Sequence, residues 1–342
     1  MKRQKIKKTS IVDIAKAGGV SVTTVSRILN NKPDVAEETR QRILKLIEEH
    51  GFAPQIAWQQ LRSGKSHFIA LHFPQDFNPP SHGIITSAAM ACEDAGYSLN
   101  LIANTLSDSE LLAIFRSGQA DGIILMEILT HDLRVELLRE QDLPFVMIGR
   151  CADNTGLSYV DLDIGQGIGE AIQYLHALGH RKIGFISLAP ILQEKEYGYA
   201  TWALKGYEKA CQQQGLPVLW RTAELKNGDP TSVVLELLGE HPDITAIVTP
   251  QEIGVSAVLK AINSKGLQVP KDISVVGLLT ESMSELITPP LTTISFPQHD
   301  MGYEATKILV SQLTGESTTP QQLLLKPQLI VRGSTGPAPT NR

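Results

Sequence analysis

Four neighbouring side chains have the types needed to read the edges of DNA base pairs. They are Val22, Thr23, Ser26 and Arg27, and on a helix they share one face. Arg27 can hydrogen bond a guanine edge, Thr23 and Ser26 can bond bases or phosphates, and valine methyl groups can contact a thymine methyl. Because these side chains are small or forked, the pattern predicts a helix that lies in a major groove.

The surrounding residues predict two short helices that would position this face. Ser10–Asp13 forms a Ser-x-x-acid start signal, and the apolar face that follows it ends at Gly18–Gly19. Ser21 can cap the second helix. The buried side of that helix is predicted from apolar residues at i, i+3 and i+4: Val25, Ile28 and Leu29. Two helices joined by a tight turn are therefore expected.

A third helix is predicted from about Glu37 to His50, with a stop at Gly51. Its apolar residues at helical spacing are Ile43, Leu44 and Ile47. Packed on the first two helices, they would close a small core.

The charge is divided unevenly along the chain. Residues 1–66 hold 13 Lys and Arg against 6 Asp and Glu, a net charge of +7, whereas the rest holds 18 against 30, a net charge of −12. An acidic body would be repelled by DNA, so contact is expected only through the basic segment. The residues expected to contact phosphates are Lys2, Arg3, Lys5, Lys7, Lys8, Thr24 and Asn30.

The segment after the third helix could form one more short helix. Pro54 would open it, and it would extend to about Leu61. A single helix of about eight residues is marginal in water, so it needs a stabilising partner. DNA together with a second chain could supply that partner.

The N-terminal segment resembles the head of the lac repressor / gal repressor family. The resemblance lies in Ile11–Ala15, Gly19–Asn30 and Glu37–Arg40. It implies that Pro54–Leu61 is a hinge helix, paired across a homodimer, with Leu61 inserted into the minor groove at the centre of the operator.

This segment departs from the family pattern at three positions. Ala36 stands where the family has a Ser cap on the third helix, a change that costs about 1 kcal/mol. Trp58 and Gln59 replace a small residue and an Arg of the hinge helix. Either the hinge packs differently on its partner, or its binding to the minor groove is weaker.

From His67 onward, short apolar runs alternate with helical patterns. This rhythm predicts parallel sheets covered by helices, in two similar α/β lobes that face a cleft. The predicted strands are residues 68–73, 98–102, 122–126, 144–148, 182–186, 244–248, 273–277 and 329–331.

The resemblance extends through this body, which is similar to the sensor domain related to periplasmic sugar-binding proteins. It is carried by Leu178–Phe185, Gly206–Tyr207, Val269–Gly277 and Thr288–Ile294. It implies two parallel-sheet lobes that close on a small-molecule effector and reorient the hinges of a homodimer.

The predicted cleft departs from the family pattern. Ala203 replaces an Arg, Gln251-Glu252 replaces Asn-Asp, Leu278–Thr280 lacks the usual aromatic and Asp residues, and Asn78–His82 replaces Asn-Pro-Phe-Phe. A sugar gripped by Arg and Asp does not fit these residues, which favour a less polar or differently charged effector, or loss of sensing. The residues expected to line the cleft are Pro80, Ser81, His82, Arg150, Thr201, Trp202, Gln251 and Thr280.

Other patterns point away from catalysis, metals and cofactors. Gly165, Gly167 and Gly169 miss the spacing of nucleotide-binding loops and are expected to permit close helix packing. The three widely spaced cysteines are expected to be buried thiols, and the nine histidines show no metal-binding spacing. No signal peptide or membrane span is predicted, which places the protein in the cytoplasm.

Together these features predict a DNA-binding transcription regulator that represses from a near-palindromic site as a homodimer. The predicted domains are a helix-turn-helix head (1–52), a hinge (53–66), a two-lobed effector and dimerisation domain (67–332) and a disordered tail (333–342). Two alternatives remain: a regulator without an effector, and an α/β enzyme with a fused helical head.

Overall fold

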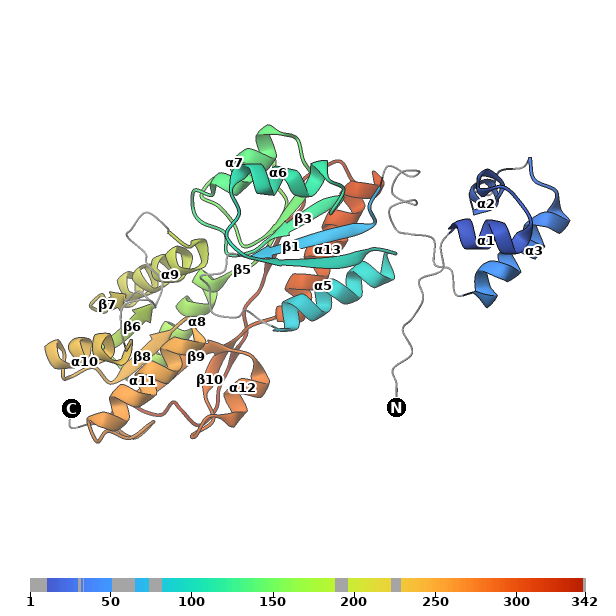
Figure 1. The fold of residues 1–342 in the computed structure, drawn as a ribbon. Coiled ribbons are helices and arrows are strands. Elements are labelled where there is room, and N and C mark those ends of the chain that lie inside the picture. Colours follow the sequence, from blue (N-terminus) through green and yellow to red (C-terminus); the bar gives the residue numbers. More distant parts are fainter. Residues whose placement is uncertain are drawn as a thin grey trace, which may run out of the picture. The chain divides into compact units, whose positions relative to one another are not determined.

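The chain divides after Ser66 into two compact units, each with its own core (Figure 1). The computed structural model describes residues 11–29, 32, 34–50, 65–73, 82–187, 196–222 and 229–340. Unit 1 is helical, and unit 2 contains two six-stranded sheets.

Unit 1 consists of the three predicted helices, α1 (Ile11–Gly18), α2 (Val22–Leu29) and α3 (Glu37–Glu49). The turn between α1 and α2 contains Gly19 at φ +66°, a left-handed conformation that glycine adopts at little cost. The predicted cap of α2 is present, because Ser21 Oγ accepts a hydrogen bond from the backbone N–H of Thr24 at 3.0 Å. Ala36 is the N-cap of α3 and offers no side-chain hydrogen bond.

The core of unit 1 confirms the predicted burial of Val25 and Ile28 in α2 but corrects the predicted phase of α3. Val25 and Ile43 are fully buried, whereas Leu44 is 41% exposed. Leu46 and Ile47 pack against the core beside Ile43. Positions 43, 46 and 47 share one helical face, and Leu44 is rotated about 100° from Ile43 because an α-helix has about 3.6 residues per turn.

The first lobe of unit 2, named here lobe A, is built on the sheet β11-β5-β4-β3-β1-β2, whose paired strands are all parallel. Its strands are β1 (Phe68–Phe73), β2 (Ser98–Ala103), β3 (Gly122–Leu125), β4 (Phe145–Ile148), β5 (Tyr159–Leu162) and β11 (Gln322–Leu325). Its helices are α5 (His82–Asp94), α6 (Asp108–Arg116), α7 (Leu133–Glu140) and α13 (Gln298–Thr314).

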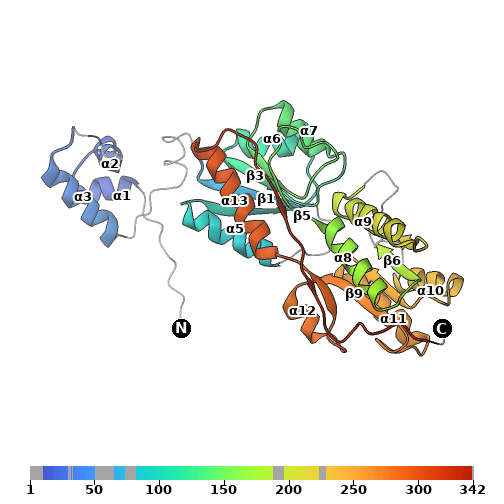
Figure 2. The same ribbon diagram turned by 180° about the vertical axis from the view of Figure 1, so that it is seen from behind.

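Alternation along β1 explains why helices cover both faces of this sheet. Ile69 and Leu71 belong to the cluster under α5 and α13, and Ala70 belongs to the opposite cluster under α6 and α7. Successive strand residues point to opposite faces, so a fully apolar strand needs cover on both sides. Figures 1 and 2 show α5 and α13 side by side on one of these faces.

Lobe B is built on the sheet β12-β10-β9-β8-β6-β7. Its strands are β6 (Ile183–Ser187), β7 (Leu219–Thr222), β8 (Ala246–Thr249), β9 (Ser274–Leu279), β10 (Thr292–Ser295) and β12 (Leu329–Ile330). Its helices are α8 (Ile164–Ala177), α9 (Gly198–Gln214), α10 (Thr231–Glu240), α11 (Glu252–Ser264) and α12 (Glu281–Leu286). All strand pairs in this sheet are parallel except β10 with β12.

All eight predicted strands are present, with bounds that agree to within two residues, but β5, β7, β10 and β11 were not predicted. The strand β10 was missed because Thr292 and Thr293 are polar, although both are fully buried. Their hydroxyls are satisfied inside the sheet, where Thr293 Oγ1 donates to the carbonyl of Gly277 at 3.0 Å.

The two lobes are not successive halves of the chain. The chain leaves lobe A after β5, returns to it for α13 and β11, and ends in lobe B with β12. At the return to α13, Phe296 packs against the cores of both lobes. Lobe A therefore depends on residues that follow most of lobe B in the sequence.

The predicted disorder of the C-terminal tail is wrong for residues 333–340. Ser334 is 1% exposed, and its hydroxyl donates to the carbonyl of Val275 at 2.6 Å and accepts from the N–H of Thr292 at 2.8 Å. Further along, the N–H of Ala338 donates to the carbonyl of Leu178 at 2.9 Å. The Gly-, Pro- and Thr-rich composition therefore marks a tail that binds as an extended segment to the surface of lobe B.

Two of the three glycines predicted to permit helix packing do so. A Cβ on Gly206 of α9 would lie 2.4 Å from the backbone of Gly165 in α8, and a Cβ on Gly167 would lie 2.8 Å from Ile294. Nothing lies within 4 Å of a Cβ on Gly169, so that prediction is wrong for this residue. The three cysteines are buried free thiols, as predicted: Cys92, Cys151 and Cys211.

Within the part of the chain that the structure describes, no helix has the length and apolar character required to cross a bilayer.

Candidate functional site: a base-reading helix and a polar junction between two lobes

The predicted reading face lies on the outside of α2. Val22 and Thr23 are exposed, Ser26 is partly exposed, and the Arg27 side chain is 56% exposed. On the opposite side of the helix, Val25 and Ile28 are buried in the core of unit 1. The helix therefore presents the four predicted side chains outward from a fixed support.

Arg27 forms an ion pair with Asp34, which follows α2 in the chain, at 3.1 Å. Both side chains are at least half exposed, so the pair is worth at most about 1 kcal/mol. The guanidinium can exchange this carboxylate for a base edge or phosphate at small cost.

Two arginines of α3 hold the ends of the first two helices. Arg40 donates to the carbonyl of Ile28 at 3.4 Å, and Arg42 donates to the carbonyl of Gly18 at 3.3 Å. These contacts use carbonyls that have no partner within their own helices. Arg40 was noted in the sequence only as part of the family resemblance, and its contact with the end of α2 was not predicted.

Part of the predicted DNA-contacting set falls outside the described residues. These positions are Lys2, Arg3, Lys5, Lys7, Lys8, Asn30 and Leu61. Thr24 is described, and its hydroxyl lies 2.9 Å from that of Ser21 at the start of α2.

In unit 2, backbone hydrogen bonds join lobe A to the start of α9 in lobe B. The N–H of Thr130 donates to the carbonyl of Glu196 at 2.8 Å, and the N–H of Gly198 donates to the carbonyl of Ile128 at 2.8 Å. The region formed by residues 127–130, 150, 196–202 and 251 is called the lobe junction below.

Aromatic and charged side chains from both lobes meet at the lobe junction. Arg150, which follows β4, pairs with Asp161 of β5 at 3.2 Å, and its guanidinium lies 4.9 Å from the centre of the Trp202 ring. The ammonium of Lys205 lies 4.7 Å from the same ring centre. Burial raises the pKa of Asp161 to about 7, although Arg150 opposes this shift.

Four polar side-chain atoms at the lobe junction are buried without a hydrogen-bond partner among the described residues. They are Glu127 Oε2, Arg150 Nε, Thr201 Oγ1 and Trp202 Nε1, of which Arg150 Nε belongs to the ion pair with Asp161. Buried polar groups in proteins are nearly always bonded, so each such atom calls for an explanation. A polar ligand that bonds to these atoms is one explanation with a functional meaning.

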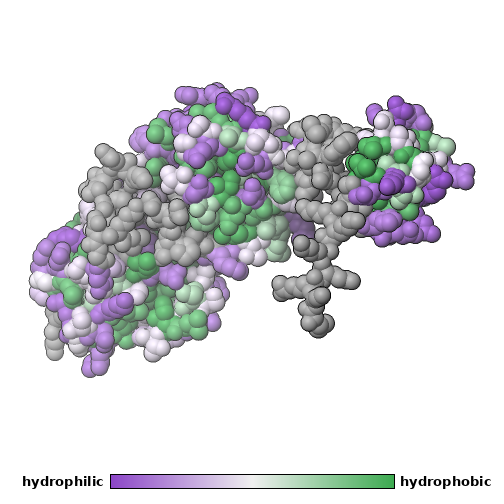
Figure 3. Space-filling model, in the orientation of Figure 1, coloured by the Kyte–Doolittle hydropathy of each residue, from purple (hydrophilic) through white to green (hydrophobic). Residues whose placement is uncertain are grey.

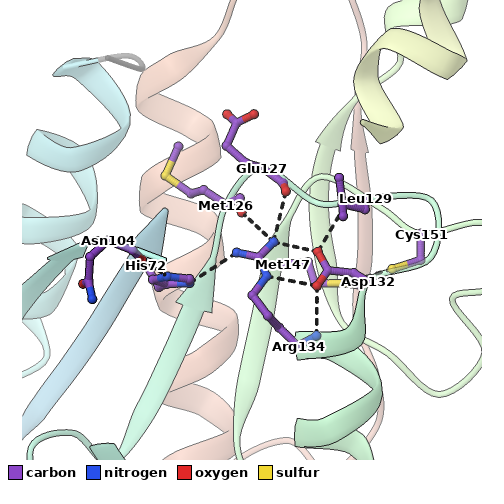
Figure 4. A network of polar contacts seen from close by, with 9 residues as sticks. All are labelled: His72, Asn104, Met126, Glu127, Leu129, Asp132, Arg134, Met147 and Cys151. Atoms are coloured by element: carbon purple, nitrogen blue, oxygen red, sulfur yellow. Dashed lines mark hydrogen bonds and ion pairs between the residues drawn. The ribbon is translucent and has the colours of Figure 1, made fainter. Parts of the chain in front are cut away.

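The backbone of Glu127 is held in an uncommon conformation by a buried clamp (Figure 4). Its φ is +55°, in the left-handed region that a residue with a side chain rarely adopts. Arg134 donates to the carbonyls of Met126 at 3.1 Å and Glu127 at 3.0 Å, and it pairs with Asp132 at 2.6 Å. The Glu127 carboxyl points away from Arg134 in Figure 4.

His72 anchors this clamp to β1. Its Nε2–H donates to the carbonyl of Asn104 at 2.9 Å, which leaves Nδ1 to accept from Arg134 at 3.2 Å. Burial lowers the pKa of His72 and keeps the ring neutral, as this pair of bonds requires.

Burial also raises the pKa of Glu127, to about 8, and nearby Arg134 opposes that shift. The pKa of Tyr199 is raised by burial and by Glu127, whereas its hydrogen bond with Gln251 opposes the shift. Glu127 of lobe A and Tyr199 of lobe B thus lie close enough to interact electrostatically.

Of the predicted cleft residues, Arg150, Thr201, Trp202 and Gln251 lie at the lobe junction. His82 begins α5 and Thr280 caps α12, and no described hydrogen bond, ion pair or ring contact links either of them to the junction. Pro80 and Ser81 lie outside the described residues.

Glu127, Tyr197 and Tyr199 were not predicted from the sequence. Glu127 follows the apolar run 122–126 directly, and side chains at the carboxyl ends of parallel strands are placed to meet ligands. Arg150, which was predicted, also follows a strand, so the position of Glu127 in the sequence offered a comparable signal.

Comparison with known families and proteins agrees with both units. Residues 10–55 match the family described as bacterial regulatory proteins, lacI family, and residues 172–335 match the periplasmic binding protein-like domain. The HTH-type transcriptional regulator MalR of Streptomyces coelicolor is 30% identical over 350 residues, covering 98% of each chain. The HTH-type transcriptional regulator DegA of Bacillus subtilis is 29% identical, covering 97% of this chain and all of that protein.

Solved structures extend the match to the whole fold. A transcriptional regulator CelR-cellobiose complex has a TM-score of 0.72 and 27% identity, and covers 96% of this chain. The lac repressor dimer bound to operator and the anti-inducer ONPF has a TM-score of 0.83 at 22% identity, also over 96% of this chain, and supports the fold. The chain therefore belongs to the lacI family of bacterial regulatory proteins, with a helix-turn-helix head and a periplasmic-binding-protein-like body.

Proposed function

We propose that the protein represses transcription by binding a near-palindromic DNA site as a homodimer, under control of a small molecule at the lobe junction. The observation that carries the proposal is the outward face of α2, where Thr23 and Arg27 are exposed over a closed core. Contacts of this face with base edges would determine which sequence is bound, and the Lys and Arg residues at positions 2–8 would add affinity by contacting phosphates. Such a regulator acts on DNA in the cytoplasm.

The experiment that tests this function is selection of bound duplexes from a random pool by the purified full-length protein. The expected product is one motif with two related half-sites, because a symmetric dimer reads a symmetric sequence. Equal recovery of all sequences at moderate ionic strength would overturn the proposal.

The dimer is supported by an apolar surface on lobe A. Met90 of α5 is 49% exposed, and Leu101 of the edge strand β2 is 46% exposed. Figure 3 shows apolar atoms gathered on the face over β1, β2 and α5. Exposed apolar patches beside an open strand edge favour association with another chain. A Leu101→Lys variant should sediment as a monomer at concentrations where the unaltered protein is a dimer.

Control by an effector is supported by the unpartnered polar atoms of Glu127, Thr201 and Trp202. A ligand that bonds to atoms of both lobes stabilises their closed arrangement, and this shifts the equilibrium between two body conformations. The segment 53–66 would transmit the change as a hinge between head and body. Thermal unfolding against a metabolite panel tests for the effector, and DNA binding in its presence gives the direction of control.

The proposal of a regulator rather than an enzyme rests on the relatives, which are transcriptional regulators across their full lengths. Turnover assays with the full-length protein and candidate sugars or nucleotides test the alternative. Sustained product formation would favour the enzyme.

A further inference from the structure

We propose that the effector carries a protonated amino group, which pairs with the carboxylate of Glu127. The proposal deepens the function above and rests on it. It concerns the charge of the ligand, which the unpartnered atoms alone do not specify.

The acids at and beside the lobe junction differ in their partners. Glu196 forms no ion pair among the described residues, but it accepts a hydrogen bond from the Thr130 hydroxyl at 3.1 Å. Arg134 pairs with Asp132 at 2.6 Å, and Arg150 pairs with Asp161 at 3.2 Å. Glu127 forms no ion pair among the described residues, and its Oε2 is buried without a hydrogen bond. A positive charge at Oε2 would complement the Glu127 carboxylate, whereas the ammonium of Lys205 lies 4.7 Å from the centre of the Trp202 ring.

The surroundings of Glu127 favour an ammonium as that charge. Tyr199 interacts electrostatically with Glu127, and the rings of Tyr197 and Tyr199 lie 5.9 Å apart, centre to centre. Aromatic faces and a carboxylate together form a common site for ammonium groups. The cationic groups of Arg150 and Lys205 already form cation–π contacts with the Trp202 ring, so this ring is occupied by the protein's own cations.

The free energy of burial explains why a cation binds here better than a hydroxyl group. Burying a carboxylate without a partner costs free energy. Burial therefore raises the pKa of Glu127 to about 8, so that the carboxyl group stays protonated, and uncharged, below that pH. An ammonium at Oε2 stabilises the ionised form. On binding, the Glu127 carboxyl then loses its proton to the buffer, whereas a hydroxyl ligand bonds to the protonated carboxyl and releases none.

The groups that face Glu127 and affect its titration are Arg134 of lobe A and Tyr199 of lobe B. Arg134 keeps its charge throughout, and burial holds Tyr199 neutral well above its ordinary pKa. Asp161 beside the junction also has a raised pKa, of about 7, so the Glu127→Gln variant is needed to assign the released proton to Glu127.

The first experiment uses matched ligands that differ only in charge. Full-length protein is unfolded thermally with glucosamine, glucose and N-acetylglucosamine, and with a series of primary amines and their alcohol counterparts at millimolar concentration. We expect at least one amine to raise the melting temperature while its neutral counterpart does not. Equal shifts from both members of each pair, or no shift from any amine, would overturn the proposal.

The second experiment measures protons. Calorimetric titration with the active amine, in buffers of different ionisation enthalpy, should show release of close to one proton per ligand below the pKa of about 8 and none well above it. Glu127→Gln should lose the proton release and weaken amine binding at least tenfold. Glu93→Gln, which alters an exposed acid of α5 outside the lobe junction, should retain both. Amine binding without proton release would contradict the assignment.

The two levels of the proposal fail separately. If duplex selection yields a symmetric motif but amines do not bind, the regulator stands and its amine effector is wrong. If no motif emerges, the regulatory function is wrong whatever the body binds.

Discussion

At the residue scale, the base-reading role depends on a side chain that already has a partner. Arg27 is paired with Asp34 in the free head, yet both are exposed enough for water to weaken the pair. A guanine edge offers two hydrogen bonds in place of one carboxylate contact. Under the proposed function, Arg27 would contribute to selection because its present partner is easily displaced.

Arg27→Ala is expected to reduce affinity for the selected site by about 1–3 kcal/mol and to relax preference at one base position. Binding titrations on duplexes altered base by base measure both effects. Asp34→Asn serves as the control, because it removes the ion pair and leaves the reading face intact. The base preference of the Asp34→Asn variant should be unchanged. If the Arg27→Ala variant kept the base preference of the unaltered protein, another residue would read that base.

Glu127→Gln is expected to stabilise the free protein, and more so as pH rises. The folded pKa of about 8 exceeds the ordinary 4.5, so the fold binds this proton more tightly than the unfolded chain. The contribution of this proton to the free energy of unfolding is fully present below pH 4.5 and is lost as the pH rises toward 8. We expect a gain of about 1–3 kcal/mol near pH 8 and little near pH 4.5, from chemical unfolding. Glu93→Gln, an exposed acid, should show no such trend.

At the scale of elements, close helix contacts and a strapped tail hold lobe B together. The helices α8 and α9 approach closely where Gly165 faces Gly206. The C-terminal segment crosses to β9 and β10 through Ser334 and then to the loop after α8 through Ala338. Neither feature is built from a long apolar run. The helix contact depends on two glycines, and the docking of the tail depends on backbone and hydroxyl hydrogen bonds.

Gly206→Ala is expected to destabilise unit 2 by about 1–3 kcal/mol, because the new methyl group would lie 2.4 Å from the Gly165 backbone. Gly169→Ala on the facing helix is the matched control. Its methyl group would meet nothing within 4 Å, so better helix propensity should give a gain of up to about 1 kcal/mol. Urea unfolding of both variants checks the pair, and equal effects would contradict the described contact.

Ending the chain after Arg332 is expected to lower the stability of lobe B by about 2–4 kcal/mol, since several hydrogen bonds of about 1 kcal/mol each disappear. The loss includes the bond from Gly336 N–H to Ser274 Oγ at 3.1 Å and that from His180 to the Gly336 carbonyl at 3.0 Å. Ending the chain after Thr340 should change nothing measurable. Thermal unfolding compares the two, and equal melting temperatures would show that the tail does not contribute.

At the scale of the whole molecule, charge separates the two units. Unit 1 carries a net charge of +7 and the remainder −12. Long-range forces thus direct DNA to the head and away from the body. Within unit 2, the repeated passage of the chain between lobes means that movement at the lobe junction involves several segments at once.

Affinity for duplex DNA is therefore expected to fall steeply with salt, by roughly a factor of 10³ or more between 50 and 200 mM if six or more phosphates are contacted. Unit 2 alone, from His67 onward, should show no measurable DNA binding at any of these salt concentrations. Fluorescence anisotropy with labelled duplexes measures both. Retention of DNA binding by unit 2 would contradict the assignment of contact to the head.

Much of this architecture could be predicted because its causes are local. The cap at Ser21, the turn at Gly19 and the apolar runs of eight strands depend on residues adjacent in the sequence. Arg150, Trp202 and Gln251 were selected by their places after strands or in a family pattern, and the fold brings them together. The error at Leu44 is also local, since two helical phases were possible and only packing selects one.

The tertiary structure decided whatever depends on residues far apart in the sequence. The pairing of β11 with β5, the position of α13 in lobe A and the docking of the tail join segments that no short pattern connects. The same holds for the charges at the lobe junction, where Arg134 and Arg150 have ion-pair partners and Glu127 has none among the described residues. Sequence order determines which side chains are available, but burial and distance determine which of them remain unpaired, because both depend on how the whole chain packs.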